Sequence, residues 1–163
     1  VGDGCILSGV YKGFRDLQQL GLIASIPTIV GVQAQTSDAL CRAFTTGVFI
    51  NRPTSTVADS ICVDVPRNGL HALTQLKKFD GEMMTVTDDE IIAAQRSLSS
   101  TTGLFAEPAG AAAWAGFLKA APRLDPDALT VVLCTGNGLK DSAAATRGVQ
   151  VPDTLITTID DIA

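Results

Sequence analysis

The 163-residue sequence has few aromatic residues, few basic residues and no long uninterrupted apolar run. Aromatic residues make up 5%, and 12 basic against 17 acidic residues give a formal net charge of -5. Proteins that follow a phosphate backbone need clustered positive charge, and single-strand binders also need aromatic platforms. Polar residues interrupt every apolar run before the roughly 20 residues of a membrane-spanning helix. We therefore expect no nucleic-acid partner, no membrane partner and no secretory signal peptide.

Metal-binding residues are equally scarce. Cysteines stand at positions 5, 41, 62 and 134 without a Cys-x-x-Cys pair, and His71 is the only histidine. A zinc site needs clustered Cys and His ligands, so we expect no metal site. The wide, irregular spacing favours reduced and buried thiols over disulfides, which is typical of a cytoplasmic protein.

The abundant residues predict a folded globular chain. Hydrophobic residues make up 46% and charged residues 18%, a balance that excludes intrinsic disorder. The length is that of one ordinary domain, so we expect residues 1–163 to form a single α/β domain. The chain starts at Val1 and enters a glycine turn with no strand before it. We interpret this start as that of a fragment, a processed chain or one half of a split gene.

Strand-like and helix-like patterns alternate along the chain. Apolar runs predict strands, and helical spacing of apolar residues predicts helices. The strands are expected at 27–34, 60–65, 83–86, 129–134 and 154–159, and the helices at 6–21, 37–47, 70–76, 87–98 and 108–119. In the first helix the expected buried stripe is Ile6, Val10, Phe14, Leu17 and Leu20. This alternation predicts a mainly parallel open sheet with helices on both faces.

Residue types at the helix ends sharpen these predictions. Ser37 is the expected N-cap of one helix, which Gly47 ends. Thr87 and Glu90 have the spacing of a capping box. Pro108 begins an Ala-rich helix that is apolar almost all round and is therefore expected to be buried.

The first candidate site is the turn Gly2-Asp3-Gly4-Cys5-Ile6, which leads directly into a helix. Consecutive N–H groups of such a turn, with the unpaired donors of a helix N-terminus, form a cradle for a phosphate. Glycine allows close approach of the backbone and a positive φ. A purely geometric role for the glycines is the alternative. The turn has neither the GxGxxG spacing nor the GK[ST] of a P-loop.

Four further polar positions are candidates for binding a ligand or lining a cleft. Thr135 and Asn137 follow the run 129–134, and ligands of open α/β sheets bind beyond strand C-termini. The alternative for them is an N-capped turn. Glu107 precedes a helix, where an ordinary cap or a partner of the helix dipole is the alternative. Asp59 lies in a polar loop and is more often a turn residue.

Five segments, taken in order, resemble the threonine synthase family of fold type II pyridoxal-phosphate (PLP) enzymes, which are tryptophan-synthase-β-like. These are Val1–Phe14, Pro27–Ala34, Thr56–Ile61, Phe105–Ala112 and Cys134–Asp141. The resemblance covers nearly the whole chain, but only the C-terminal part, in the large domain, of such an enzyme. It implies a cytoplasmic lyase of threonine biosynthesis that converts O-phospho-L-homoserine and water to L-threonine and phosphate.

The resemblance also assigns roles to residues. It implies that Gly2, Asp3, Gly4, Cys5 and Ile6 bind the cofactor phosphate. Thr135 matches the hydroxyl that faces the pyridine nitrogen, and a neutral hydroxyl leaves that nitrogen largely unprotonated. Asn137 and Gly138 would shape the same turn, whereas Asp59 and Glu107 match loop positions near the cofactor.

One departure from the family pattern decides what this chain can do alone. In the family, the Schiff-base lysine, its Ser-Phe-Lys neighbourhood and the substrate loop precede the glycine turn, and no segment of 1–163 matches them. We therefore assign no catalytic residue, and we expect weak or absent PLP binding and no turnover by the chain alone. Its expected partner is the missing N-terminal half, or a second copy through self-association. The alternatives are a serine/threonine dehydratase-like fragment and a non-catalytic α/β binding or assembly module.

Overall fold

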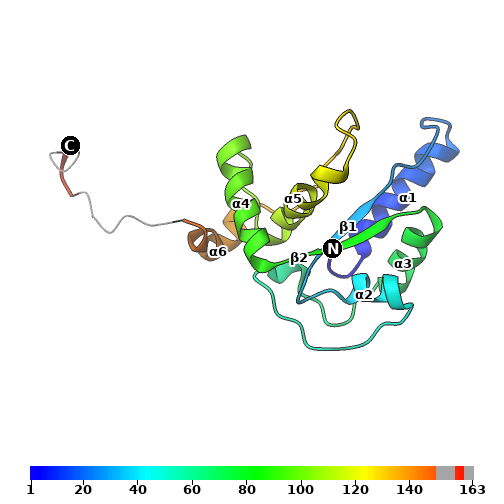
Figure 1. The fold of residues 1–163 in the computed structure, drawn as a ribbon, viewed down its shortest axis with the longest axis horizontal. Coiled ribbons are helices and arrows are strands. Elements are labelled where there is room, and N and C mark those ends of the chain that lie inside the picture. The colour runs from blue at the N-terminus through cyan, green and yellow to red at the C-terminus, as the bar shows by residue number, and fades with distance from the viewer. Residues whose placement is uncertain (150–156, 160–163) are drawn as a thin grey trace.

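The computed structural model describes residues 1–149 and 157–159, which show the alternation of helices and strands in Figure 1. The elements are α1 (Cys5–Gln19), β1 (Val30–Ala34), α2 (Ala39–Thr46), η1 (Asp59–Ile61), α3 (Gly69–Lys78), β2 (Glu82–Val86), α4 (Asp88–Thr102), α5 (Pro108–Ala120), η2 (Ala121–Arg123), η3 (Gly138–Asp141) and α6 (Ser142–Arg147). Among these residues, no helix has both the length and the apolar character needed to cross a membrane.

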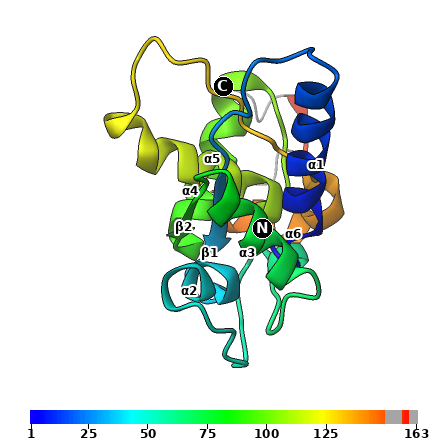
Figure 2. The same cartoon turned by 90° about the vertical axis from the view of Figure 1, so that its right-hand side faces the viewer.

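The sheet consists of β1 and β2, which pair in parallel with Val30 opposite Glu82 and Ala34 opposite Val86. One face of the sheet, including Val32 and Val86, packs against α4 and α5 in a shared core. The other face meets α1, which lies on the opposite side of the strands from α5 (Figure 2). The predicted fold class, an open parallel sheet with helices on both faces, is confirmed for a small sheet.

Helix α5 approaches β1 closely because Gly116 has no side chain. A Cβ at Gly116 would lie 2.4 Å from a methyl carbon of Val32, which real contacts do not allow. The Ala-rich face of α5 is buried, as the sequence predicts. Small residues on this helix therefore determine how near it lies to the sheet.

A second core joins α1, α2 and α3 on the other side of the strands. Its buried residues are Leu7, Tyr11, Leu40, Ala43, Ala72, Leu73 and Leu76. Each fully buried Leu contributes about 1.5–3 kcal/mol relative to an exposed one. This core holds the N-terminus of α1 against the start of α3, which places the glycine turn.

The buried face of α1 differs from the predicted one. Ile6 and Leu20 are 64% and 73% exposed, and the buried residues are Leu7, Ser8 and Tyr11. The helix carries apolar residues on two neighbouring stripes, one that contains Ile6 and Val10 and one that contains Leu7 and Tyr11. Only the stripe with Leu7 and Tyr11 packs against α2 and α3. Its bounds, Cys5–Gln19, agree with the prediction of 6–21 to within two residues.

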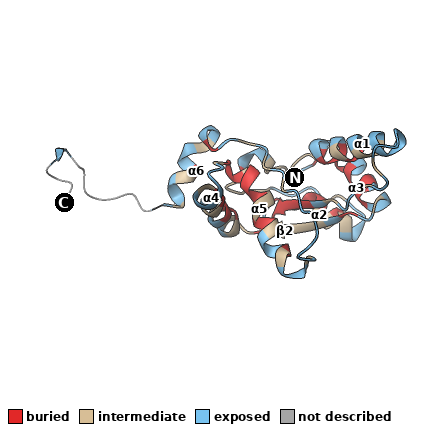
Figure 3. Cartoon of the chain, turned by 90° about the horizontal axis from the view of Figure 1, so that it is seen from above, coloured by how far each residue is buried: buried red, intermediate tan, exposed pale blue. Residues whose placement is uncertain are grey.

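Two predicted strands are wrong within the described residues. Residues 60–65 contain the end of η1 followed by irregular chain, and residues 129–134 have no regular secondary structure and pair with no strand among the described residues. Leu129, Val131 and Leu133 are 95%, 82% and 55% exposed, and Figure 3 shows burial concentrated instead on the strands and the helix faces that meet them. Of the predicted strand 154–159, residues 154–156 lie outside the described residues, and 157–159 form no strand.

The helix ends are mostly as predicted. Thr87 and Glu90 form a complete capping box at α4, with hydrogen bonds in both directions. Gly47 ends α2 with a φ of 79°. Ser37 does not cap α2, whose N-cap is Asp38, because the Ser37 hydroxyl accepts the N–H of Val63 instead.

The four cysteines are free thiols that differ in their exposure. Cys5 is exposed rather than buried, and the other three cysteines are half-buried free thiols. Burial raises the pKa of the Cys134 thiol. His71 is exposed on α3, in hydrogen-bond contact with Gln75 at 3.0 Å.

Candidate functional site

The glycine turn at the start of α1 depends on Gly4 in two ways. Gly4 is the N-cap residue and has a φ of 85°, which favours glycine. It is also buried, and a Cβ there would lie 2.8 Å from the Cβ of Ala72 on α3. The conformation of the backbone and the space around it therefore both require glycine.

The turn leaves backbone donors available at its open side. The Ser8 N–H donates to the Gly4 carbonyl at 3.0 Å, so the amides of Cys5, Ile6 and Leu7 precede the first intrahelical bond. No side chain caps this end, and the side chains of Cys5 and Ile6 are exposed. Unused donors and the positive end of the helix dipole suit a bound anion, so the turn fits the phosphate group of a cofactor.

A hydrogen-bond network ties the turn to the start of α3. The Asp3 carboxylate accepts the Arg67 N–H at 2.9 Å, and its carbonyl accepts the Asn68 N–H at 3.1 Å. The Asn68 amide donates to the Ser8 hydroxyl at 2.8 Å and to the Gly4 carbonyl at 3.3 Å. The Asp3 side chain is thus an anchor. No local sequence pattern predicts this role of Asn68, because Asn68 is 64 residues away from Gly4.

The short helix η1 lies directly beside the turn. A Cβ at Gly2 would lie 3.1 Å from the Cα of Ile61, so the two backbones are in close contact. Asp59 begins η1, is exposed and accepts a hydrogen bond from the Ser60 hydroxyl at 3.1 Å. The structure therefore brings the segment that carries Asp59 to the glycine turn.

The second group of candidate residues is the turn 135–138 with Glu107. The Glu107 N–H donates to the Gly136 carbonyl at 2.9 Å, and the Gly138 N–H donates to the Phe105 carbonyl at 2.9 Å. A Cβ at Gly136 would lie 1.9 Å from a carboxylate oxygen of Glu107, so glycine is required there. These contacts fix the turn against the start of α5.

Glu107 is held by a lysine that sequence reasoning did not assign. Its side chain is almost fully buried, and the Lys140 Nζ lies 2.9 Å from its Oε2 and 3.1 Å from its Oε1. Glu107 stands at the N-cap position of α5 but makes no side-chain cap. Its carboxylate therefore pairs with Lys140 and supports the turn.

Thr135 and Asn137 lie at the open side of this second turn, and both are exposed. The Asn137 side chain accepts the Leu139 N–H at 2.9 Å and caps η3, which is the structural alternative that the sequence left open. Thr135 directly precedes Gly136, whose carbonyl accepts the Glu107 N–H.

The two groups stand on one shared core. Ala58, next to η1, is buried together with Ala112 and Ala115 of α5, and Ile61 packs against the same cluster. Helix α5 begins immediately after Glu107. The glycine turn and the turn 135–138 are thus both attached to the packing of η1 on α5.

The backbone entering the glycine turn lies along β1. The Val1 amino group donates to the Val32 carbonyl, and the side-chain amide of Gln33 donates to the Val1 carbonyl at 3.0 Å. Burial lowers the pKa of this amino group to about 5. Val1 therefore lies at the edge of β1 that does not pair with β2.

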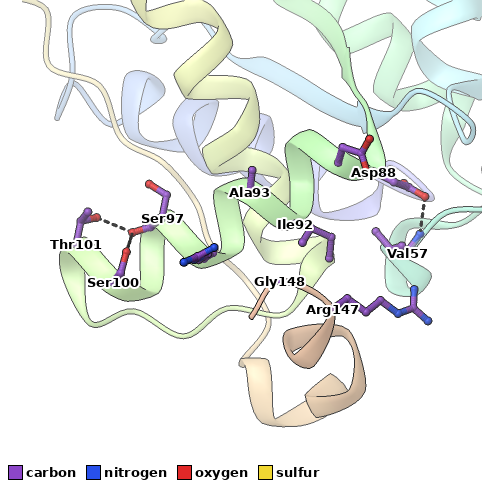
Figure 4. Close-up of a pocket in the computed structure, with 11 residues that line it drawn as sticks. Val57, Asp88, Ile92, Ala93, Ser97, Ser100, Thr101, Arg147 and Gly148 are labelled. Carbon is purple, nitrogen blue, oxygen red and sulfur yellow. Dashed lines mark hydrogen bonds between the residues drawn. The ribbon is translucent and has the colours of Figure 1, made fainter. Parts of the chain in front are cut away.

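A cavity of about 660 Å³ lies elsewhere, between the outer face of α4, the end of α6 and Val57 (Figure 4). None of the candidate residues named above lines it.

Comparison with known proteins identifies relatives for most of the chain. The profile of the family described as "Pyridoxal-phosphate dependent enzyme" matches residues 1–136. The threonine synthase of Methanocaldococcus jannaschii is 33% identical over 157 residues, which cover 93% of this chain and 39% of that protein. The threonine synthase of Methanosarcina acetivorans is 34% identical over 167 residues, covering 99% of this chain and 41% of that protein. The chain thus spans well under half the length of these relatives.

The fold has close counterparts among solved structures. An L-serine ammonia-lyase from Rhizomucor miehei superposes with a TM-score of 0.73 at 23% identity, covering 91% of this chain and 47% of that one. At this identity the likeness concerns the fold alone.

Proposed function

Because the chain belongs to the pyridoxal-phosphate dependent enzyme family, we propose that it forms part of a threonine synthase-like lyase. The complete enzyme would convert O-phospho-L-homoserine and water to L-threonine and phosphate. The observation that carries this proposal is the glycine turn, with its open amides and its buried Gly4. Identity of 33–34% to two threonine synthases supports this reaction.

The two groups of candidate residues take different ends of the cofactor in this proposal. The open amides of Cys5 and Ile6 hold the phosphate, and the Thr135 hydroxyl faces the pyridine nitrogen. Pyridoxal phosphate, when bound, supplies an electron sink for chemistry at the α-carbon of an amino acid. The ion pair of Glu107 and Lys140 keeps the Thr135 turn in place, because it holds the residues that follow Thr135.

The five lysines of this chain are either ion-paired or exposed in the last turn of α3. Lys12, Lys119 and Lys140 pair with Asp16, Glu90 and Glu107, in that order. Lys77 and Lys78 are exposed in the last turn of α3. We therefore propose that the Schiff-base lysine belongs to a part of the enzyme outside these 163 residues, and that the chain alone binds PLP weakly and does not turn over substrate.

The surface of the sheet suggests where that other part would bind. The Ile29 carbonyl accepts the Glu82 N–H, and the Gln35 N–H donates to the Val86 carbonyl. The backbone groups of Ile29 and Gln35, at the two ends of β1, therefore face β2. The Val32 carbonyl faces the opposite edge, where it meets Val1. The segment 129–134 is also unpaired within the described residues, and its alternate apolar side chains are exposed. The proposed partner covers this edge and this segment with its own apolar chain.

Cys5 gives the sharpest test of the phosphate site, because its side chain is exposed at the first position of α1. Cys5→Asp places a carboxylate beside the open amides, whereas Cys5→Ser is a neutral control of similar size. Two unit charges about 4 Å apart repel by about 1 kcal/mol in water and about 4 kcal/mol near a protein surface. Titration with PLP should show binding weakened at least fivefold by Cys5→Asp and unchanged by Cys5→Ser. Equal affinity of both variants would remove the phosphate site from the proposal.

The reaction is tested after reconstitution with the N-terminal part of a threonine synthase. Release of phosphate from O-phospho-L-homoserine, with formation of L-threonine, supports the proposed lyase. Formation of a 2-oxo acid from serine or threonine would instead identify the serine/threonine dehydratase alternative, which shares the fold. Assembly with neither product would support the non-catalytic module.

A further inference from the structure

The cavity on the outer face of α4 carries charges of both signs that do not pair with each other. Its volume is about 660 Å³, and its walls come from α4, from the end of α6 and from Val57. Two arginines, Arg96 and Arg147, and two aspartates, Asp88 and Asp89, line it, so their formal charges cancel. A ligand of balanced charge therefore suits the cavity better than a simple anion or cation.

One end of the cavity presents a carboxylate that is already held in place. The Asp88 carboxylate accepts the Val57 N–H at 3.1 Å and a hydrogen bond from the Thr56 hydroxyl. Both bonds fix its orientation at the start of α4. A fixed carboxylate with acceptor capacity to spare is a ready partner for an ammonium group.

Arg147 reaches the same end of the cavity from the opposite wall. Figure 4 shows its side chain extending from α6 towards the end where Asp88 and Val57 meet. Among the described residues, however, no nitrogen of Arg147 lies within 4.0 Å of a carboxylate oxygen. The space between the Arg147 guanidinium and the Asp88 carboxylate therefore suits a ligand that carries both a negative and a positive charge.

The rest of the lining includes the apolar Ile92 and Ala93 beside the charged Asp89 and Arg96, and it carries hydroxyls at its far end. Ile92 and Ala93 lie between the two ends in Figure 4. At the far end the hydroxyls of Ser100 and Thr101 donate to the Ser97 carbonyl at 3.2 and 2.7 Å. The protons of these two hydroxyls are therefore already engaged. Ile92 and Ala93 offer a surface for an apolar side chain.

We propose that this cavity binds a free α-amino acid with a small apolar side chain. Its carboxylate pairs with Arg147 and its ammonium group with Asp88, which suits an amino acid because both charged groups stand on one carbon. The side chain lies over Ile92 and Ala93. A ligand with only one of the two charges leaves Asp88 or Arg147 facing it uncompensated, which is how the cavity discriminates. This site is separate from the glycine turn and does not depend on the proposed reaction.

The test is calorimetric titration of the full chain with L-valine, 3-methylbutanoate and 2-methylpropan-1-amine. The second probe lacks the ammonium group of valine, and the third lacks its carboxylate. We expect saturable binding of L-valine below about 10 mM and at least tenfold weaker binding of both analogues, since each loses one charge-assisted contact. Equal binding of valine and 3-methylbutanoate, or no saturable binding of valine, overturns the proposal.

Variants test the residues assigned to each charge. Arg147→Gln and Asp88→Asn should each weaken L-valine binding at least tenfold, and Arg147→Lys should restore part of it. The matched control is Arg123→Gln, whose residue pairs with Glu82 outside the cavity and should leave binding unchanged. Circular dichroism of each variant verifies its fold. Unchanged affinity of folded Arg147→Gln would remove the amino-acid site.

Discussion

When the chain is prepared as residues 1–163, so that Val1 is its first residue, the buried amino group of Val1 makes the stability of that chain depend on pH between about 5 and 8. In the folded chain its pKa is lowered from 8.0 to about 5 because burial disfavours the charged form. Between these values the unfolded chain binds a proton that the folded chain does not, so stability rises with pH. Three pKa units correspond to an upper limit of about 4 kcal/mol, which is lost completely once the pH falls below 5.

The measurement compares urea unfolding of the free chain with that of the Nα-acetylated chain from pH 4.5 to 8.5. Acetylation removes the charge but keeps an N–H that can donate to the Val32 carbonyl. Other titrating groups affect both chains alike, so the difference between the two curves isolates Val1. We expect the free chain to lose up to about 4 kcal/mol relative to the acetylated chain as the pH falls from 8 to 5. Parallel curves would refute burial of this amino group.

Two further predictions concern the turns of the candidate site. Gly4→Ala should destabilise the chain by about 2–4 kcal/mol, because alanine is strained at a positive φ and its Cβ clashes with α3. Gly9→Ala is the control and should stabilise the chain slightly, because a Cβ at Gly9 has no atom within 4 Å. Thermal unfolding of both variants checks this, and equal shifts would contradict it. Lys140→Met should lower the free energy of unfolding by about 1–2 kcal/mol, because it leaves the buried Glu107 carboxylate unpaired. The control Lys119→Met removes an exposed ion pair and should lower it by under 1 kcal/mol. Chemical unfolding measures both losses, and similar values would count against a buried partner for Lys140.

The sequence predicted most helices and the paired strands because their signals are local. The capping box of Thr87 and Glu90 and the stop at Gly47 need only residues a few positions apart. The buried face of α1 could not be chosen in this way. Leu7 with Tyr11 and Ile6 with Val10 are equally spaced, and only packing against α2 and α3 selects the first pair.

The segment 129–134 shows a different limit of sequence reasoning. Its apolar, β-branched residues favour burial, and the sequence pattern therefore predicted a buried strand. Burial, however, depends on a neighbouring strand, and no such neighbour pairs with this segment among the described residues. Pattern and environment therefore disagree at Leu129 and Val131.

The sequence predicted the two glycine turns of the candidate site but not the residues that hold them in place. Glycine signals at residues 2–4 and 136–138 marked both turns, and a positive φ at Gly4 agrees with the prediction. The partners that hold the turns are remote in sequence. Asn68 reaches Gly4 from 64 residues away, and Lys140 reaches Glu107 from 33 residues away. Such pairs depend on the tertiary fold, which local spacing does not specify.

The exposed valine and leucine side chains of residues 129–133 also determine how the protein behaves at high concentration. An exposed, β-branched and unpaired segment is prone to strand addition between molecules, and the segment contains no charged residue or proline to oppose this. In a cell, chaperones and proteases compete for chain of this kind. The solubility and lifetime of the protein therefore depend on how quickly this segment is covered.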